Sequence, residues 1–164
     1  MGDYLRIIGA IAVILAFLLL SGAYTSYIRQ RASEYSAFLV FLELMRREIS
    51  SSLCTAGELG ARSNDEALEK LGFLSALRRG ERIVDAFDKT ADKSLLSKED
   101  RASLRRYFAD FGLGTLTSEL RTLEGCIVAF SVCEREEREN APKRTRLATT
   151  LLLLFGLAVT VLLI

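Results

Sequence analysis

Two long apolar runs, one near each end of the chain, dominate its hydropathy pattern. Residues 7–28 and residues 147–164 contain no charged side chain. An α-helix rises about 1.5 Å per residue, so the second run reaches about 27 Å, close to the hydrocarbon thickness of a bilayer. Only Thr149, Thr150 and Thr160 interrupt it, whereas a buried core helix normally keeps a polar face. Both runs are therefore predicted to span a membrane.

The segment between the runs, residues 29–146, has a helical period throughout, because its apolar residues recur every three or four positions. No alternating run of β-branched residues is long enough for a sheet. The sequence predicts an all-α bundle of about five helices, flanked by an N-terminal and a C-terminal transmembrane helix. The residues expected to face inward are Tyr35, Phe38, Leu39, Val40, Phe41, Leu42, Leu44, Met45, Ile49, Leu53, Phe73, Leu74, Leu77, Ile83, Val84, Phe87, Leu104, Tyr107, Phe108, Phe111, Leu120, Leu123, Ile127 and Phe130.

Local signals mark where these helices begin and end. Ser63 and Glu66 have the spacing of a capping box, and Gly72 is expected to end that helix. Gly80 is expected to divide the next helical stretch in two. Ser97 caps a further helix, which ends at Gly112.

Two connections to the apolar runs remain open. The helix beginning near residue 34 is either buried on more than one side or a continuation of the first span. The last helix of the middle segment covers about residues 118–139. Pro142 either occupies the first turn of the terminal helix or kinks a continuous one, since proline is compatible with both.

Charge is dense but balanced. The chain has 22 Lys and Arg against 21 Asp and Glu, and all of them except Asp3 and Arg6 lie between the apolar runs. Nucleic-acid binding normally requires a face of one positive sign. The near-neutral composition therefore gives no reason to expect a nucleic-acid partner.

The basic residues predict the topology. Arg29 and Arg31 follow the first run, and Lys143, Arg144 and Arg146 precede the second. Basic flanks favour the cytoplasmic side of a membrane. We expect residues 1–28 and 147–164 to be two spans of one cell membrane, with residues 29–146 as a cytoplasmic domain between them.

A cleaved signal peptide is the alternative interpretation of the first run. One basic residue, an apolar stretch and the small residues "SGA" at positions 21–23 fit its general form. Cleavage after Ala23 would make the chain an exported helical protein held by its C-terminal anchor. The basic residues before that anchor would then lie on the disfavoured side of the membrane.

Few residues carry recognisable chemistry. The chain has no histidine, and Cys54, Cys126 and Cys133 form neither a CxxC pair nor an even set, which argues against a zinc site and a disulfide framework. Buried or half-buried thiols in a reducing compartment are the favoured interpretation. "GLGTLTSE" lacks the strand and lysine of a phosphate loop. We predict no catalytic residue, cofactor or metal, and hence no enzyme.

Two sets of charged residues are candidate sites. Glu48, Glu119 and Glu124 form a conceivable acidic site, but carboxylates on helices are mostly solvated or ion-paired. The string "RRGER", which contains Arg78, Arg79 and Arg82, is a candidate for docking an acidic partner. A solvated helix end is the favoured alternative.

Four local strings, in order, resemble one family. They are "IIGAIAVILAFLLLSGAY", "LELMRREISSSL" with Glu48 and Ile49, "YFADFGLGTLTSEL" with Phe111, Gly112, Gly114 and Glu119, and "LRTLEGCIVAFSVCEREERENAPKRTRLATTLLLL". The chain resembles stage III sporulation protein AB, a two-span protein of endospore-forming bacteria. Many members have Leu-Thr-Pro after the second string and a longer FGxxLG string, whereas this chain has "LCTAG" and "FGLG".

The resemblance implies a role in the assembly between mother cell and forespore. The family is similar to the inner-membrane platform protein of type II secretion and type IV pilus systems, which implies a scaffold that couples a cytosolic ATPase to a channel. A generic two-span adaptor of another secretion or pilus machine is the alternative. The sequence leaves open whether the chain forms a homo-oligomer.

Overall fold

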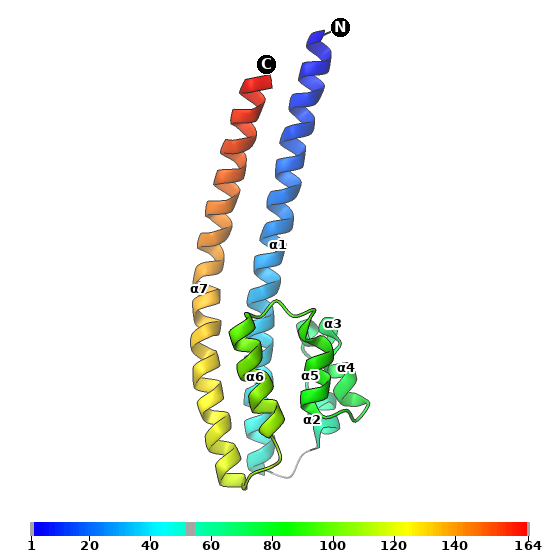
Figure 1. The fold of residues 1–164 in the computed structure, drawn as a ribbon, viewed down its shortest axis with the longest axis vertical. Coiled ribbons are helices and arrows are strands. Elements are labelled where there is room, and N and C mark those ends of the chain that lie inside the picture. Colours follow the sequence, from blue (N-terminus) through cyan, green and yellow to red (C-terminus); the bar gives the residue numbers. More distant parts are fainter. Residues whose placement is uncertain (1, 52–54, 164) are drawn as a thin grey trace. The chain divides into compact units, whose positions relative to one another are not determined.

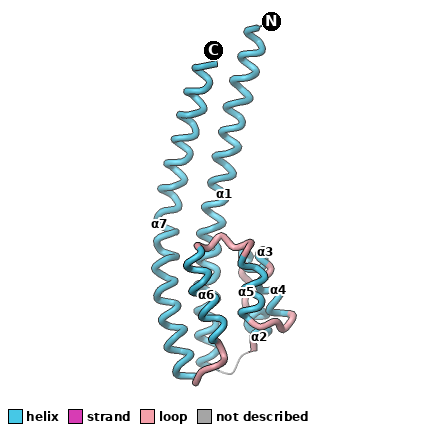
Figure 2. The backbone as a smooth tube through the Cα atoms, viewed as in Figure 1, coloured by secondary structure: helices cyan, strands magenta, loops and turns pink. Residues whose placement is uncertain are grey.

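A computed structural model describes residues 2–51 and 55–163, and these residues form helices with no strand (Figures 1 and 2). The predicted all-α fold with an apolar helix at each end is confirmed. Leu53 and Cys54 lie outside the described residues. The helices are α1 (Gly2–Ser51), α2 (Ala56–Arg62), α3 (Glu66–Leu71), α4 (Phe73–Arg78), α5 (Ile83–Ala91), α6 (Lys98–Asp110) and α7 (Leu116–Leu163).

The chain divides into two compact units, each containing parts of α1 and α7. One unit is Met1–Arg29 with Arg138–Ile164, and the other is Gln30–Glu137. We call the first the apolar pair and the second the helical domain. Residues 138–146, which the sequence analysis placed in the middle segment, belong to the apolar pair.

Both long helices run without a break from one unit into the other. The helix containing Tyr35 continues the first apolar run, which decides the first of the open connections. Pro142 lies inside α7 and is exposed, so it does not begin a separate terminal helix. Because proline has no N–H, the carbonyl of Arg138 receives no intrahelical hydrogen bond from residue 142.

Helix ends in the helical domain follow local capping chemistry, with one correction. Gly72 and Gly80 have positive φ of 88° and 82°, where a side chain would be strained, and they separate α3, α4 and α5 as predicted. Ser97 caps α6 by accepting a hydrogen bond from the Asp100 N–H at 3.0 Å. Each of these capping or helix-ending residues acts on backbone groups only a few positions away, so its effect can be predicted from the sequence.

The predicted cap at Ser63 is wrong. The N-cap of α3 is Asp65, whose carboxylate accepts hydrogen bonds from the backbone N–H groups of Ala67 at 2.8 Å and Leu68 at 3.4 Å. Ser63 instead follows the end of α2. Helix α2 was not predicted, although Thr55 and Glu58 form a capping box at its start.

Aromatic rings fill the centre of the helical domain. Phe73 packs against four other phenylalanines, with ring centroids 5.1–6.4 Å away. Most predicted inward residues are buried, but Val40 is 50% exposed because it projects from α1 away from this core. The four partners of Phe73 are Phe38, Phe41, Phe87 and Phe108.

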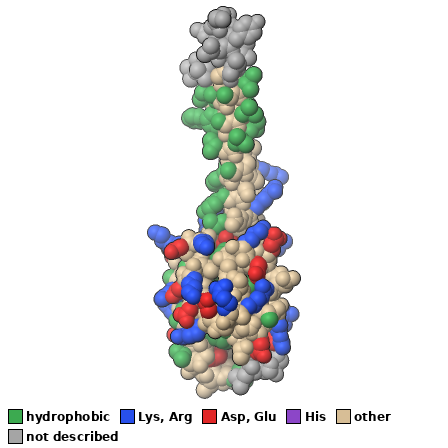
Figure 3. Space-filling model, turned by 90° about the vertical axis from the view of Figure 1, so that its right-hand side faces the viewer, with side chains coloured by type: hydrophobic (Ala, Val, Ile, Leu, Met, Phe, Trp, Pro, Cys, Tyr) green, Lys and Arg blue, Asp and Glu red, His purple; other side chains and the backbone are tan. Residues whose placement is uncertain are grey.

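The apolar pair has the opposite distribution of side chains. Two described helices, α1 and α7, are long and apolar enough to cross a membrane, and only 6% of each apolar window is buried. On the face drawn in Figure 3, apolar side chains gather on this unit, and basic side chains lie beside them. The two helices meet where Ser21 Oγ donates a hydrogen bond to Thr149 Oγ1 at 3.2 Å. Gly156 lies against the ring of Phe17, 3.2 Å from where a Cβ would be.

Candidate functional site

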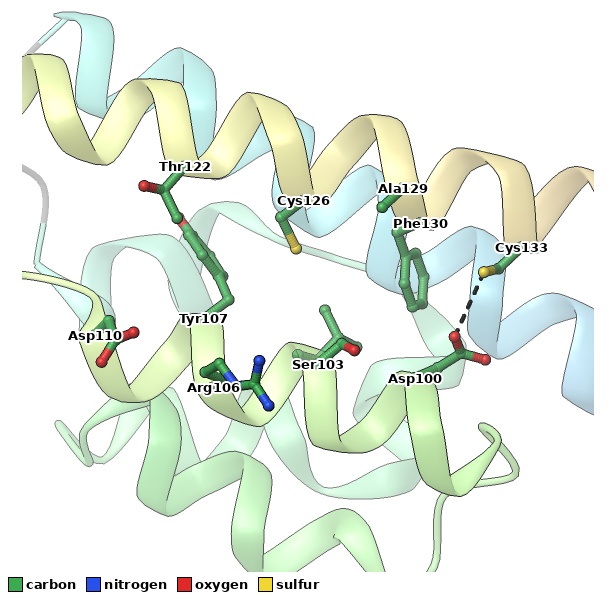
Figure 4. Close-up of a pocket in the computed structure, with 11 residues that line it drawn as sticks. Asp100, Ser103, Arg106, Tyr107, Asp110, Thr122, Cys126, Ala129, Phe130 and Cys133 are labelled. Atoms are coloured by element: carbon green, nitrogen blue, oxygen red, sulfur yellow. Dashed lines mark hydrogen bonds between the residues drawn. The ribbon is translucent and has the colours of Figure 1, made fainter.

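The seam between α6 and α7 in the helical domain contains the pocket drawn in Figure 4, with a volume of about 290 Å³. Leu104, Cys126 and Phe130 give it an apolar lining. Arg106 and Asp110 add charges of both signs from α6. The remaining lining residues are Asp100, Ser103, Tyr107, Thr122, Ala129 and Cys133. The seam thus combines an apolar surface with charged and polar side chains.

Tyr107 is the distinctive residue of this seam. Its side chain points from α6 toward Thr122 on α7 (Figure 4), and the residue is only 7% exposed. It also lines a neighbouring pocket of about 330 Å³. The buried hydroxyl has no hydrogen-bond partner among the described residues. Because an unpaired buried hydroxyl costs free energy, this one is suited to an acceptor supplied from outside the chain.

The hydroxyl of Tyr107 is a donor at neutral pH. Burial raises its pKa, and the neighbouring Cys126 and Glu119 raise it further by disfavouring a second negative charge. A phenol that stays protonated offers one O–H to an incoming acceptor. A ligand that matches this site therefore carries an oxygen acceptor for the Tyr107 hydroxyl next to an apolar group for the pocket.

A hydrogen-bond network around Asp100 closes one end of the first pocket. Its carboxylate accepts from Tyr35 Oη at 2.5 Å, Ser97 Oγ at 2.6 Å and Cys133 Sγ at 3.4 Å. Burial alone would raise the pKa of Asp100, but these three donors and the charge of Arg31 lower it below its ordinary value. The network ties α1, α6 and α7 together, so this end of the seam is structural.

The two described cysteines are half-buried, as predicted. Burial raises the pKa of the Cys126 thiol. Burial and the carboxylate of Asp100 raise the pKa of Cys133 to about 11. Since the thiolate is the reactive form, neither cysteine is an activated nucleophile at neutral pH.

Four of the predicted residues meet at the loop between α6 and α7. The Glu119 carboxylate accepts hydrogen bonds from the backbone N–H groups of Gly112 at 2.8 Å and Gly114 at 3.2 Å. Gly112 has a φ of 87°, which favours glycine. Phe111 packs against the core beside them. Phe111, Gly114 and Glu119 also line the second pocket, so this loop forms one end of the seam.

The other predicted residues lie on other elements. Glu48 of α1 pairs with Arg62 of α2, and Ile49 packs against the core. The Arg78 side chain donates to the carbonyls of Gly60 at 3.0 Å and Ser63 at 3.3 Å. These contacts are intramolecular and give the residues a structural role.

Two of the three arginines of the "RRGER" string, Arg78 and Arg79, are paired with carboxylates of this chain. Arg78 also pairs with Glu69 at 3.0 Å, and Arg79 pairs with Glu81 at 3.1 Å. Arg82 is exposed at the start of α5. Docking of an acidic partner at these arginines stays a prediction.

The described residues contain no group of three or more Cys, Asp or Glu side chains placed to hold a metal ion. Tyr107 was predicted as a core residue and not as a site residue. The available signal was a tyrosine in an otherwise apolar stripe, because a buried tyrosine needs a hydrogen-bond partner that leucine or phenylalanine does not.

The comparisons with known proteins identify a family. A search of curated proteins and a search of solved structures find no match to the chain. The family model for stage III sporulation protein AB matches residues 6–164, which is nearly the whole sequence. It therefore covers both apolar runs, the helical domain and the α6–α7 seam. The chain belongs to the stage III sporulation protein AB family and is a sporulation-related protein.

Proposed function

We propose that the protein is a non-enzymatic membrane component of the secretion-like channel between mother cell and forespore. In this role it is a scaffold and a docking site for the cytosolic ATPase of that assembly. Its two apolar helices cross the membrane on the mother-cell side of the forespore boundary, and the helical domain lies in the cytoplasm. The family is not a known enzyme family.

The match of the family model over residues 6–164 carries the proposal. That range includes two helices of sufficient length and apolarity to span a bilayer, joined by a helical domain with its own core. A domain attached to two spans remains close to the membrane, which suits a component that connects a soluble enzyme to a channel.

The α6–α7 seam is the surface that we propose for the ATPase. Its apolar lining, its charges of both signs and the unpartnered hydroxyl of Tyr107 resemble the centre of a protein interface. An apolar side chain of the partner fills the pocket, and a neighbouring carbonyl or carboxamide oxygen accepts the hydrogen bond from Tyr107. The loop held by Glu119 supports one end of this contact.

Deletion of the gene in an endospore-forming host tests the general role. We expect sporulation to stop after engulfment, vegetative growth to remain normal, and the full-length gene to restore heat-resistant spores. Unchanged spore counts in the deletion strain would contradict the proposal.

Replacement of Tyr107 by phenylalanine tests the docking surface. Loss of one buried hydrogen bond across an interface costs about 1 kcal/mol, so we expect about fivefold weaker binding of the purified ATPase to the full-length protein. The free protein loses only an unpaired hydroxyl, so its thermal stability is unchanged or slightly higher.

The matched control is Tyr35→Phe. Tyr35 Oη donates to Asp100 and accepts from the Ser97 N–H at 3.1 Å, so this variant is less stable. It nevertheless retains ATPase binding where it is folded. Equal binding by the wild-type protein and the Tyr107→Phe variant would exclude the seam as the docking surface while leaving the sporulation role intact.

A further inference from the structure

Basic side chains are concentrated at the end of the apolar pair that leads into the helical domain. Residues 24–29 and 138–146 contain five Lys or Arg and one Asp or Glu, a net charge of +4, whereas the whole chain carries only +1. The five are Arg29, Arg138, Lys143, Arg144 and Arg146. The remainder of the protein is therefore net acidic, and the positive charge is localised here.

The contacts within the pair place these residues at a common height. Because the helices are antiparallel and Ser21 meets Thr149, each step forward along α1 matches one step backward along α7. Tyr24 is then level with Arg146, and Tyr27 is level with Lys143, to within about one helical turn. Two tyrosines of one helix and the basic cluster of the other thus lie at one level of the pair.

The side chains at this level are accessible. Tyr24 and Tyr27 are 43% and 45% exposed. Arg29, Lys143 and Arg146 are also exposed. Exposed apolar side chains begin immediately next to them, at Leu20 on α1 and Leu147 on α7. A ligand that lies along this surface therefore meets positive charge and phenolic O–H groups at one end and hydrocarbon at the other.

We propose that Tyr24, Tyr27, Arg29, Lys143, Arg144 and Arg146 form a binding site for the phosphate-bearing headgroup of an anionic phospholipid. We call this set the basic collar. Guanidinium and ammonium groups donate charge-assisted hydrogen bonds to phosphate oxygens, and tyrosine side chains favour the membrane interface. The acyl chains of the lipid lie along the neighbouring leucines. A free anion or an acidic peptide would leave that apolar surface without a partner.

The test uses the full-length protein reconstituted in nanodiscs that contain equal amounts of phosphatidylglycerol and phosphatidylcholine. Gentle extraction followed by native mass spectrometry counts the lipids that stay bound. We expect the wild-type protein to retain phosphatidylglycerol in preference to phosphatidylcholine. Equal retention of the two lipids would overturn the proposal.

A triple variant, Arg29→Gln, Lys143→Gln and Arg146→Gln, tests the residues. Each basic side chain near an anionic surface contributes about a fivefold factor in affinity, so the triple variant loses about a hundredfold. The matched control removes three exposed arginines of the helical domain, with Arg46→Gln, Arg47→Gln and Arg121→Gln. The control retains the lipid, and helicity measured by circular dichroism is unchanged in both variants. Equal loss in both variants would show a general charge effect and overturn the proposal.

Inorganic phosphate distinguishes a lipid site from a simple anion site. We expect phosphate at the concentration of the lipid headgroups to leave the bound phosphatidylglycerol in place, because it lacks the acyl chains. Displacement of the lipid by phosphate at that concentration would overturn the proposal. The lipid site rests on the proposed membrane insertion of the apolar pair. None of these measurements depends on the ATPase or on sporulation, so their failure would leave the proposed docking and sporulation roles standing.

Discussion

The apolar pair and the helical domain use the same two helices in two different ways. In the helical domain, α1 and α7 bury apolar side chains such as Phe38 and Phe130, and shorter helices complete the core. In the apolar pair, most of the large apolar side chains are exposed. The described contact there consists of Gly156 against Phe17 and the hydroxyls of Ser21 and Thr149. Water drives apolar groups together in the first case. In the membrane that we propose for the second, lipid provides no such force, so close packing and polar contacts hold the two helices together.

This difference predicts opposite responses to removing a large apolar side chain. Phe73 is fully buried in the helical domain, and Phe155 is 69% exposed in the apolar pair. We expect Phe73→Ala to lower the free energy of unfolding by about 3–5 kcal/mol, because it removes buried surface and leaves a cavity. Phe155→Ala should change it by less than about 0.5 kcal/mol. Chemical denaturation of the full-length protein in detergent, followed by circular dichroism, measures both.

Equal destabilisation by Phe73→Ala and Phe155→Ala would contradict the difference between the helical domain and the apolar pair. That result would mean that Phe155 is covered by protein, either by a second copy or by a partner span. Concentration dependence of the transition would then separate these explanations, because self-association stabilises the folded state by mass action.

Adding a side chain tests the contact in the apolar pair. A Cβ on Gly156 would lie 3.2 Å from Phe17, whereas a Cβ on Gly22 would have no atom within 4 Å. We expect Gly156→Leu to weaken the association of the two helices by about 1–3 kcal/mol. Gly22→Leu is the matched control and leaves the association unchanged. Energy transfer between labels at Ile11→Cys and Val161→Cys, with the native cysteines replaced by serine, reports the separation.

Buried polar groups provide the third test. Glu34 of the helical domain is 1% exposed, and its carboxylate accepts hydrogen bonds from the Leu95 N–H at 2.7 Å and Ser94 Oγ at 3.1 Å. Burial raises the pKa of Glu34, although these two donors oppose the shift. A carboxyl group with a raised pKa favours folding most when it is protonated. The stability that the protonated group contributes is therefore present below its ordinary pKa of 4.5 and is lost as pH rises through the raised pKa of the folded state.

Glu34→Gln should abolish the loss of folding stability that ionisation of Glu34 causes as pH rises. A carboxamide keeps an acceptor oxygen for Leu95 and carries no charge, so we expect the variant to gain melting temperature relative to the wild type as pH rises above 4.5. Asp100 has a lowered pKa and affects stability only on the acid side of 3.8, so it does not obscure the comparison. If the melting temperatures of the wild type and the Glu34→Gln variant changed in parallel between pH 4 and 8, Glu34 would be ionised in the folded state without a loss of stability.

The structural features that were predicted correctly depend on residues close in sequence or on a repeating apolar pattern. Most of the missed features depend on contacts between different helices. The stops at Gly72 and Gly80 and the cap at Ser97 were predicted, because each acts within one turn of helix. Asp65 was missed as a cap because Ser63, two residues away, offers a similar oxygen. The burial of Tyr107 was predicted from its period, but its unpaired hydroxyl depends on α7, which no local pattern describes.

The resemblance to a family contributed information of another kind. It marked Phe111, Gly112, Gly114 and Glu119 as members of one string without indicating their arrangement. The structure shows that the Glu119 carboxylate closes the loop by accepting from two glycine N–H groups. The physical reason for that spacing is a loop that needs a positive φ at Gly112 and an acceptor one turn into the next helix.

The hydrogen bond between Ser21 and Thr149 provides the smallest and most specific test of the comparison. Interhelical hydrogen bonds between membrane helices contribute about 0.6 kcal/mol on average, so we expect Ser21→Ala to weaken the association of the apolar pair by about that amount. Thr149→Ala should have a similar effect, and the double variant should be no weaker than either single variant, because both remove one shared bond. The energy-transfer labels used for Gly156 measure all three. Additive effects would mean that each hydroxyl contributes through packing alone, and that the apolar pair, unlike the helical domain, has no polar contact that sets its register.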